Sequence, residues 1–434
     1  MEAYQPRHSQ KPSSPSSTNS GYYFVPKSVC TWLACGFLAL ALLHLLCCSP
    51  LAGAGDREAL LSPLLHYFND TYSHFSSSGA GQSCDYSEGR WVRAPGHTRR
   101  YNATACDAKE SHDCIRNGRP DTGYLDWRWQ PAAAGCRLPA FDAGAFLSAV
   151  RGKHVAFVGD SMARNQAQSL VCLLGAAFPH SVVYRDPVAW RQNFWRWAFP
   201  THGVTVSMYW APFLARATGK PENDSDPDSV VHLDALADRW AADADGMDVV
   251  VLAAGHWLLN RAVYHNGSAV IGAHAHPDRS YTDIGYALPV RQAYRLAVER
   301  LVSSGRPRTV VLVTFSPHHF EGKPVDSPTA CTNTEPYKEG EKELEGFQKQ
   351  LRSIVIEEAE AGARIAGGAA RVEVLDVTKL AAMRPDGHPN VYMQRDPFAH
   401  GVQERMPSDC LHFCLPGPVD TFNEILLQIL KKRR

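Results

Sequence analysis

The 434-residue chain has no excess of one charge, because 44 basic residues balance 44 acidic ones. It has no Lys/Arg-rich block before residues 431–434 and no internal repeat. Balanced charge provides no electrostatic footprint for a polyanion, so we expect no nucleic-acid partner. Residues 431–434 follow an apolar helical run. We interpret them as the C-terminal end of a helix, where positive charge interacts favourably with the helix macrodipole. The 44% hydrophobic content is that of a folded protein.

Long charge-free runs are scarce as well, and the one at 30–53 is long enough to cross a bilayer. A cleaved signal peptide is the alternative, with Ala52-Gly53-Ala54 as its cleavage site. The length of the run and of the segment before it favours an uncleaved anchor. Lys27 precedes the span and Asp56 follows it, so we expect a single-pass type II membrane protein with its N-terminus in the cytosol.

The anchor divides the chain into segments of different composition. Residues 1–29 are rich in Ser, Pro and Gln and are expected to form a disordered cytosolic tail. Residues 54–83 contain a Ser/Gly-rich stretch and are expected to form a lumenal stem. The folded lumenal domain is predicted at 84–434, with a Cys/Trp-rich subregion at 84–150 and an α/β core at 151–434.

Cysteine is not abundant, and four of its 12 residues lie in or beside the expected span. An even set on the lumenal side indicates disulfides in an oxidising compartment, with the individual pairs left open. Zinc is the alternative, but no second Cys/His cluster completes a tetrahedral set around Cys410, His412 and Cys414, so no metal is expected. The predicted disulfide cysteines are Cys84, Cys106, Cys114, Cys136, Cys172, Cys331, Cys410 and Cys414.

Four Asn-x-Ser/Thr sequons follow the span and none precedes it. They are expected glycosylation sites on the lumenal side. The acceptor residues are Asn69, Asn102, Asn223 and Asn266.

Short apolar runs alternate with helical patterns beyond the Cys/Trp-rich subregion. Strands are expected at 154–158, 204–210, 248–253, 309–315 and 372–375, and helices at 161–174, 290–302, 341–359 and 420–430. This alternation predicts an α/β fold in which helices flank both faces of a mostly parallel sheet. The disulfide-rich N-terminal subregion is expected to pack against it.

Gly159-Asp160-Ser161 follows the first of these strands and opens a helix. In open α/β sheets, catalytic and binding residues lie at the carboxyl ends of the strands. Gly159 permits the tight turn, and Ser161 would meet the N–H groups and positive dipole end of the helix, which suit an oxyanion. A plain helix N-cap is the alternative interpretation.

Asp409-Cys410-Leu411-His412 precedes the last helix and supplies a base and a carboxylate in one loop. A serine hydroxyl needs such a base, and the base needs a group that fixes its tautomer. His412 and Asp409 are predicted to fill these roles for Ser161. The two motifs together resemble the SGNH/GDSL-like serine hydrolases, whose triad is split between an N-terminal Gly-Asp-Ser and a C-terminal Asp-x-x-His.

A longer motif narrows the resemblance. Residues 409–423, Asp-Cys-Leu-His-Phe-Cys-Leu-Pro-Gly-Pro-Val-Asp-Thr-Phe-Asn, resemble the C-terminal signature of the plant trichome birefringence-like family. The N-terminal half is similar to the same family at Cys84-Asp85, Gly89-Arg90-Trp91-Val92, Asn117-Gly118-Arg119-Pro120-Asp121 and Tyr124-Leu125-Asp126-Trp127-Arg128-Trp129. Phe413 and Phe422 stand where the family usually has Trp, and 323–328 replaces its Trp/Gly-rich stretch.

The resemblance implies an O-acetyltransferase of the Golgi membrane that acetylates hydroxyls of a cell-wall polysaccharide by double displacement. Ser161 would be acetylated first, and His412, oriented by Asp409, would serve both steps. Xyloglucan is the expected acceptor, with xylan or mannan as the alternatives. No bound cofactor is expected; the acetyl donor, acetyl-CoA or an acetylated carrier, stays open, as does a Golgi partner that delivers acetyl groups.

Further residues are expected to position the oxyanion or the substrate. Gly255 and His256, in a motif that also resembles the family, would help to form the oxyanion hole beside Gly159 and Asp160. Arg164 and Asn165, one turn into the helix, would contact substrate or donor, or would simply solvate the surface.

Two other functions use the same residues differently. An acetylesterase would deliver the acyl group to water through the same triad. A non-catalytic scaffold that binds wall polymers would not need Ser161, and the presence of all three triad residues argues against it.

Overall fold

The computed structural model describes residues 84–97, 100–106, 108–186, 194–223 and 225–432. The expected tail, anchor and stem, and the sequon at Asn69, lie outside these residues. None of the helices in the described ranges is long and apolar enough to span a membrane.

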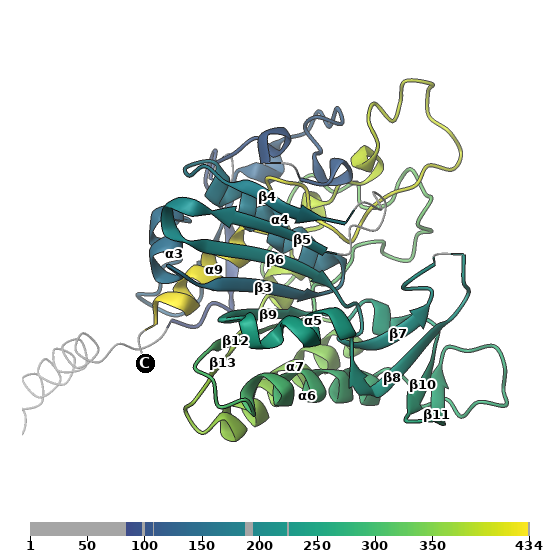
Figure 1. The fold of residues 1–434 in the computed structure, drawn as a ribbon. Coiled ribbons are helices and arrows are strands. Elements are labelled where there is room, and N and C mark those ends of the chain that lie inside the picture. The colour runs from purple at the N-terminus through teal and green to yellow at the C-terminus, as the bar shows by residue number, and fades with distance from the viewer. Residues whose placement is uncertain (1–83, 98–99, 107, 187–193, 224, 433–434) are drawn as a thin grey trace, which may run out of the picture. The chain divides into compact units, whose positions relative to one another are not determined.

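A seven-stranded sheet forms the centre of the domain (Figure 1). Its first five strands are parallel, and the last two continue the sheet in antiparallel pairing. In spatial order they are β13 (Arg371–Leu375), β12 (Thr309–Val313), β9 (Val249–Ala253), β3 (His154–Gly159), β6 (Val204–Trp210), β5 (Phe194–Phe199) and β4 (Ser181–Arg185). The predicted mostly parallel sheet is confirmed.

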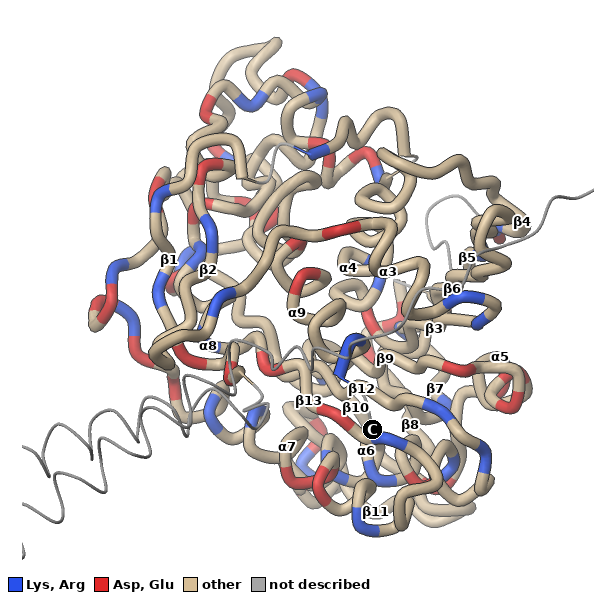
Figure 2. Tube along the Cα trace, turned by 90° about the vertical axis from the view of Figure 1, so that its left-hand side faces the viewer, with Lys and Arg blue, Asp and Glu red and all other residues tan. Residues whose placement is uncertain are grey.

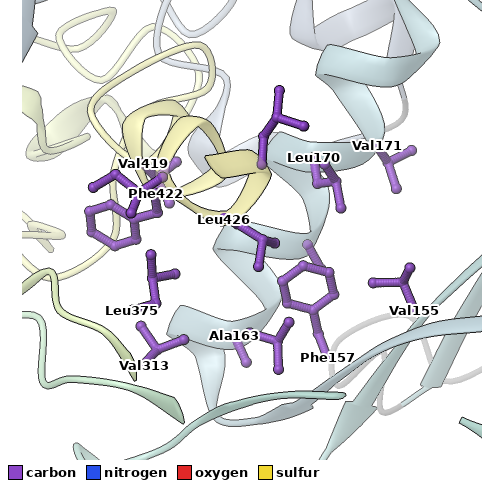
Figure 3. Close-up of a cluster of buried hydrophobic side chains, with 14 of the residues drawn as sticks. Val155, Phe157, Ala163, Leu170, Val171, Val313, Leu375, Val419, Phe422 and Leu426 are labelled. Atoms are coloured by element: carbon purple, nitrogen blue, oxygen red, sulfur yellow. The ribbon is translucent and has the colours of Figure 1, made fainter. Parts of the chain in front are cut away.

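Helices cover both faces of this sheet, as expected. One face carries α3 (Ala143–Ala149), α4 (Ser161–Gly175) and α9 (Asp420–Lys431), and the other carries α5 (Asp238–Asp243), α6 (Ala287–Val302) and α7 (Gly346–Ala366). Figure 3 shows side chains of α4 and α9 meeting those of β3, β12 and β13. Phe157 and Leu426 are fully buried there, and each such side chain contributes about 1.5–3 kcal/mol.

A second, four-stranded sheet was not predicted. Its strands are β7 (Ala215–Gly219), β8 (Ser229–Leu236), β10 (Ala262–Asn266) and β11 (Ala269–His274), in the order β11-β10-β8-β7. Polar residues such as His232 and Asp234 interrupt the apolar positions of β8, so no continuous apolar run marks it. This sheet packs against α6.

The N-terminal subregion contains little helix or strand, as its composition predicts. It contains the antiparallel strand pair β1 (Gly89–Arg93) and β2 (Trp127–Pro131) and three 3-10 turns, one of them at Glu110–His112. Another short helix, α8 (Thr378–Ala382), contacts β1. All eight predicted cysteines form disulfides, in the pairs Cys84–Cys136, Cys106–Cys172, Cys114–Cys414 and Cys331–Cys410.

Charged residues are interspersed over the described part of the chain (Figure 2). Lys and Arg alternate with Asp and Glu along the trace rather than gathering on one element. Mixed signs of this kind suit solubility rather than attraction of a highly charged polymer.

A polar network crosses the buried contact between α4 and α9. Asp420 is 1% exposed and accepts hydrogen bonds from Ser169 Oγ (2.5 Å) and Tyr101 Oη (2.8 Å). Asn423 donates to the Ser169 hydroxyl at 2.9 Å and to the Gln166 carbonyl at 3.1 Å. Burial raises the pKa of Asp420 to about 7, against the lowering effect of these donors. The two helices are therefore joined by polar contacts as well as by apolar packing.

Asp420 makes stability depend on pH. A carboxyl whose pKa is higher in the folded state stabilises fully below its unfolded value near 3.8 and loses that contribution as pH rises to about 7. We expect the stability of the wild type relative to Asp420→Asn to fall by up to about 4 kcal/mol over this range. Chemical denaturation at several pH values measures it. Asp238→Asn, at an exposed position, should keep the wild-type slope, and an unchanged slope in Asp420→Asn would contradict the assignment.

Candidate active site

Ser161 is the first residue of α4, directly after the carboxyl end of β3. The turn before it requires glycine, because a Cβ on Gly159 would lie 1.8 Å from the carbonyl oxygen of Ala253. Helix α4 begins directly after this close approach of β3 to the end of β9 and packs over β3, β6 and β9. Ser161 therefore lies where the helix dipole is positive.

Asp160 caps α4 and organises the neighbouring loop. Its Oδ1 accepts from the Met162 N–H at 2.9 Å, and its Oδ2 accepts from the N–H groups of Gly255 (3.1 Å) and His256 (3.2 Å). Burial alone would raise the pKa of Asp160, but the hydrogen bonds and the His256 side chain lower it. The Gly255 and His256 amides, expected to face an oxyanion, donate to Asp160 instead. His256 Nε2 also bonds the Ser316 carbonyl at 2.8 Å.

His412 and Asp409 form the predicted pair. His412 Nδ1 donates to Asp409 Oδ2 at 2.7 Å, which leaves Nε2 as the basic nitrogen. Asp409 Oδ1 accepts from the Leu411 and His412 N–H groups, at 3.0 and 2.9 Å. Burial opposes ionisation, but the charge and hydrogen bonds of His412 hold the pKa of Asp409 far below its usual range. Among the described residues, His412 Nε2 has no hydrogen-bond partner.

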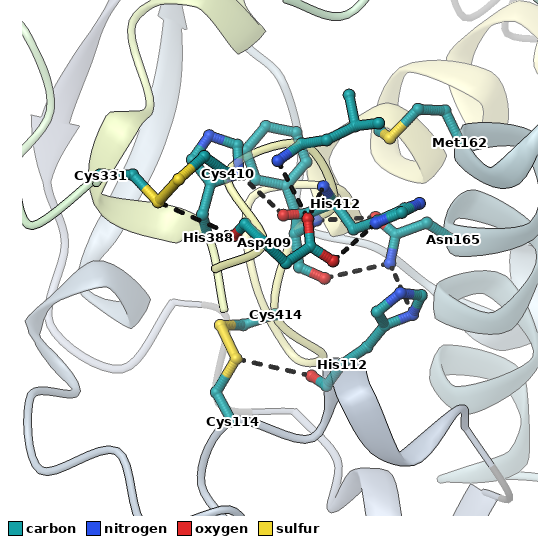
Figure 4. A network of polar contacts seen from close by, with 12 residues as sticks. His112, Cys114, Met162, Asn165, Cys331, His388, Asp409, Cys410, His412 and Cys414 are labelled. Atoms are coloured by element: carbon teal, nitrogen blue, oxygen red, sulfur yellow. Dashed lines mark hydrogen bonds and ion pairs between the residues drawn. A yellow bond between two sulfur atoms is a disulfide. The ribbon is translucent and has the colours of Figure 1, made fainter. Parts of the chain in front are cut away.

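Asn165 fastens the His412 loop to α4 (Figure 4). Its Nδ2 donates to the Phe413 carbonyl and its Oδ1 accepts from the Phe413 N–H, both at 3.0 Å. Ser161 and Asn165 are four residues apart and share one face of α4. The residue beside His412 is thus attached one turn from Ser161. Asn165, which was expected to touch substrate or solvent, is fully buried in this contact.

Arg164 is also buried rather than at the surface. Its side chain is 7% exposed, and its guanidinium lies 5.2 Å from the centre of the Trp210 ring. Desolvation lowers its pKa to about 10, against the raising effect of Asp160. The alternative in which Arg164 solvates the surface is therefore wrong.

Three residues that sequence reasoning missed support the His412 loop. Asn390 exchanges backbone hydrogen bonds with Asp409 at 2.9 and 3.1 Å and has a left-handed φ of 54°. His388 donates from Nδ1 to the His412 carbonyl at 2.7 Å. His112 packs its ring on that of His412, with centroids 4.9 Å apart. None belongs to a local motif, so only the tertiary structure could identify them.

A cavity of about 240 Å³ lies beside the backbone bridge between Asn390 and Asp409. Its wall includes Asn390, which pairs with Asp409, and Cys331, which is bonded to Cys410. Tyr392 and Phe398 supply aromatic surface, and Asn333 supplies a polar group. The size and mixed lining suit an organic ligand with hydroxyl groups.

His112, Asp409 and His412 place three potential metal-ligating atoms within 4.8 Å of one another. Two of these residues already share the 2.7 Å hydrogen bond. No fourth His, Cys, Asp or Glu joins this group in the described part of the chain, whereas a closed zinc site needs four ligands.

A helix-opening serine at the carboxyl edge of a parallel sheet, with a His–Asp pair in a loop tied to the same helix, defines an SGNH-type serine acyl-transfer enzyme. Comparison with known proteins agrees. Residues 138–429 match the GDSL/SGNH-like acyl-esterase family found in Pmr5 and Cas1p, and residues 82–136 match the PMR5 N-terminal domain. The chain therefore belongs to this PC-esterase family.

Named relatives are similar over most of their length. Xyloglucan O-acetyltransferase 2 of Populus trichocarpa is 47% identical over 81% of this chain and 82% of its own. Xyloglucan O-acetyltransferase 1 of Arabidopsis thaliana is 42% identical over 94% and 96%, respectively. Protein trichome birefringence-like 26 of Arabidopsis thaliana is 35% identical over 81% and 78%. The resemblance to the trichome birefringence-like family is confirmed.

Asp409→Asn tests the His–Asp pair. The two backbone N–H groups on Oδ1 require the amide oxygen there, so the NH2 group would face His412 Nδ1. His412 would then carry its proton on Nε2 and could not accept one from serine. We expect kcat for acetyl-ester cleavage to fall about 10³–10⁴-fold, measured with the full-length chain.

Asp326→Asn is the matched control, because Asp326 forms a surface ion pair with Arg405, a few residues before Asp409 in the chain. Surface pairs contribute little, so its kcat should stay at the wild-type value. Full activity of Asp409→Asn would remove Asp409 from the active site.

Proposed function

We propose that the protein is an O-acetyltransferase that acetylates xyloglucan through Ser161, His412 and Asp409. The observation that carries the chemistry is the His412–Asp409 hydrogen bond in a loop anchored to the helix that Ser161 opens. The names of relatives 42–47% identical to this chain support xyloglucan as the acceptor.

In the first half-reaction, Ser161 Oγ attacks the carbonyl carbon of the donor's acetyl group. His412 Nε2 takes the hydroxyl proton and returns it to the leaving group of the donor, which leaves an acetyl ester on Ser161. Asp409 holds the Nδ1 tautomer and stabilises the imidazolium. The donor is acetyl-CoA or an acetylated carrier, which a partner in the membrane would deliver.

In the second half-reaction, a sugar hydroxyl attacks the acetyl-serine. His412 Nε2 accepts the sugar proton and passes it to Ser161 Oγ as the ester bond to the enzyme breaks. The cavity beside Asp409 supports a carbohydrate acceptor, because its aromatic and amide groups suit the apolar faces and hydroxyls of a sugar. Xylan and mannan present similar hydroxyls and are the alternative acceptors.

An acetylesterase is the second candidate, and the acyl-esterase description of the matching family favours it. The same acetyl-serine would then pass its acetyl group to water. Residue types do not separate the two reactions, because they share every step except the final nucleophile.

We also propose that residues 30–53 anchor the enzyme in the Golgi membrane with residues 84–434 in the lumen. Four disulfides support an oxidising compartment. The described sequons Asn102, Asn223 and Asn266 are exposed, which supports their glycosylation.

Mass spectrometry of oligosaccharide products tests the proposal. The purified full-length chain is incubated with an acetyl donor and with xyloglucan, xylan or mannan oligosaccharides, beside Ser161→Ala. We expect acetylated xyloglucan oligosaccharide and a loss of at least about 10³-fold in Ser161→Ala. Ser303→Ala, at an exposed position, should retain full activity.

The other outcomes are equally informative. Acetylation of xylan or mannan alone would replace the acceptor, and loss of acetyl from pre-acetylated sugars with none gained would make the protein an esterase. Equal activity in Ser161→Ala would exclude the serine mechanism.

A further inference from the structure

His112 comes from the N-terminal subregion but lies inside the active site. Its ring packs on His412 with centroids 4.9 Å apart and planes inclined by 34°. The residue is fully buried, and its carbonyl accepts a hydrogen bond from the Leu415 N–H at 2.8 Å. Figure 4 shows His112 beside Asn165 and the His412 loop. The stacking face of the proposed base therefore comes from a segment about 300 residues away.

The hydrogen bonds of Asn165 define the tautomer of His112. Asn165 uses Oδ1 to accept from Phe413, so its Nδ2 must be the atom that donates to Phe413 O and to His112 Nδ1, the latter at 3.3 Å. His112 Nδ1 is thus an acceptor, and its proton is on Nε2. Asn165 therefore ties His112, the His412 loop and α4 together.

His112 Nε2 is buried and has no hydrogen-bond partner among the residues that the structure describes. A buried donor without a partner costs about 1–3 kcal/mol, and an aromatic hydrocarbon side chain would fill the same space without that cost. A phenyl ring is therefore expected to be tolerated at this position, because it would keep the stack against His412.

His112 is uncharged at neutral pH. Burial, the neighbouring His412 and Lys109 all lower its pKa, well below the usual value for histidine. A neutral ring can lie against His412 in both of its protonation states without adding a second positive charge to the site. His412 can therefore gain and lose its proton while the stack stays in place.

We propose that His112 is a positioning residue, whose ring fixes the plane of His412 and thereby the direction of its Nε2 atom. The inference rests on the proposed function of Ser161 and His412. It gives the segment that matches the PMR5 N-terminal domain a part in the chemistry. Cys114 and Cys414 each lie two residues after one of the two histidines, His112 and His412. Their disulfide holds the N-terminal segment against the His412 loop.

Three variants separate the ring from its nitrogen atoms. His112→Phe keeps a ring for the stack and loses the acceptor for Asn165, whereas His112→Gln keeps an acceptor and loses the ring. His112→Ala loses both. His180→Ala is the control, because His180 stacks on Phe199 with centroids 5.3 Å apart, near the far end of α4.

The two half-reactions are measured separately with the full-length chain. Acetylation of Ser161 is followed with p-nitrophenyl acetate and by the mass of the acetyl-enzyme. Transfer from the acetyl-enzyme is followed with xyloglucan oligosaccharide, and thermal unfolding reports on the fold. Since His412 serves both steps, a positioning residue should slow both by the same factor, without changing KM for the sugar.

We expect His112→Gln and His112→Ala to slow both half-reactions about 10–100-fold. His112→Phe should remain within about threefold of the wild type, and His180→Ala should equal it. If His112→Ala fails to fold, the rates of His112→Phe and His112→Gln still show whether the ring at this position is required.

Wild-type rates in His112→Gln would overturn the proposal. So would slowing of the sugar step alone with a raised KM, or equal slowing in His112→Phe and His112→Gln. The first half-reaction needs no sugar, so a wild-type enzyme that cleaves p-nitrophenyl acetate and acetylates no oligosaccharide would refute the proposed function and leave the role of His112 measurable.

Discussion

The carboxyl edge of the sheet depends on the side chain of Asp160. One carboxylate accepts three backbone N–H groups, one from the start of α4 and two from the loop after β9. The contact is possible because Gly159 lies against the Ala253 carbonyl with no room for a Cβ. Strand, helix and loop are therefore locked at one point, and the position of Ser161 follows from it. Buried carboxylates are costly unless they are satisfied in this way.

Helix α4 connects this point to the other elements of the site. Asn165 attaches the His412 loop, Ser169 attaches α9 through Asp420, and Cys172 attaches the N-terminal subregion through Cys106. The helix is buried on all sides, yet many of its inward contacts are polar. A polar interface between buried helices tolerates few alternative alignments, because any shift leaves donors unpaired. The alignment of nucleophile and base is thus specified by hydrogen bonds rather than by apolar packing alone.

The sequence predicted what continuous patterns encode. Five parallel strands and four helices lie near their expected positions because buried parallel strands form unbroken apolar runs. The helix expected at 341–359 instead spans Gly346–Ala366, since Glu345 forms a capping box with Gln348 at its start. Strands β4 and β5 and the second sheet were missed because their apolar runs are short, and Arg196 in β5 and His232 and Asp234 in β8 interrupt them. Arg164 was placed wrongly in one alternative because charge alone does not indicate burial.

For the site, local motifs identified Ser161, Asp409 and His412 as candidates, and the structure brings the last two into contact. The same motifs did not identify His112, His388 or Asn390, whose importance depends on neighbours distant in the chain. The pairing of the cysteines was also beyond the sequence, because it depends on which loops meet in space.

The Cys114–Cys414 disulfide joins residues 300 positions apart. A ribosome releases the N-terminal subregion long before Cys414 is made, and domains begin to fold as they emerge. Cys114 must therefore wait as a thiol, or form a temporary bond that is later exchanged, until nearly the whole chain has been synthesised. Premature pairing with another early cysteine would leave the His412 loop without its covalent link to the N-terminal subregion. The disulfide that joins the N-terminal subregion to the His412 loop can thus close only at the end of synthesis, by direct oxidation or by thiol–disulfide exchange.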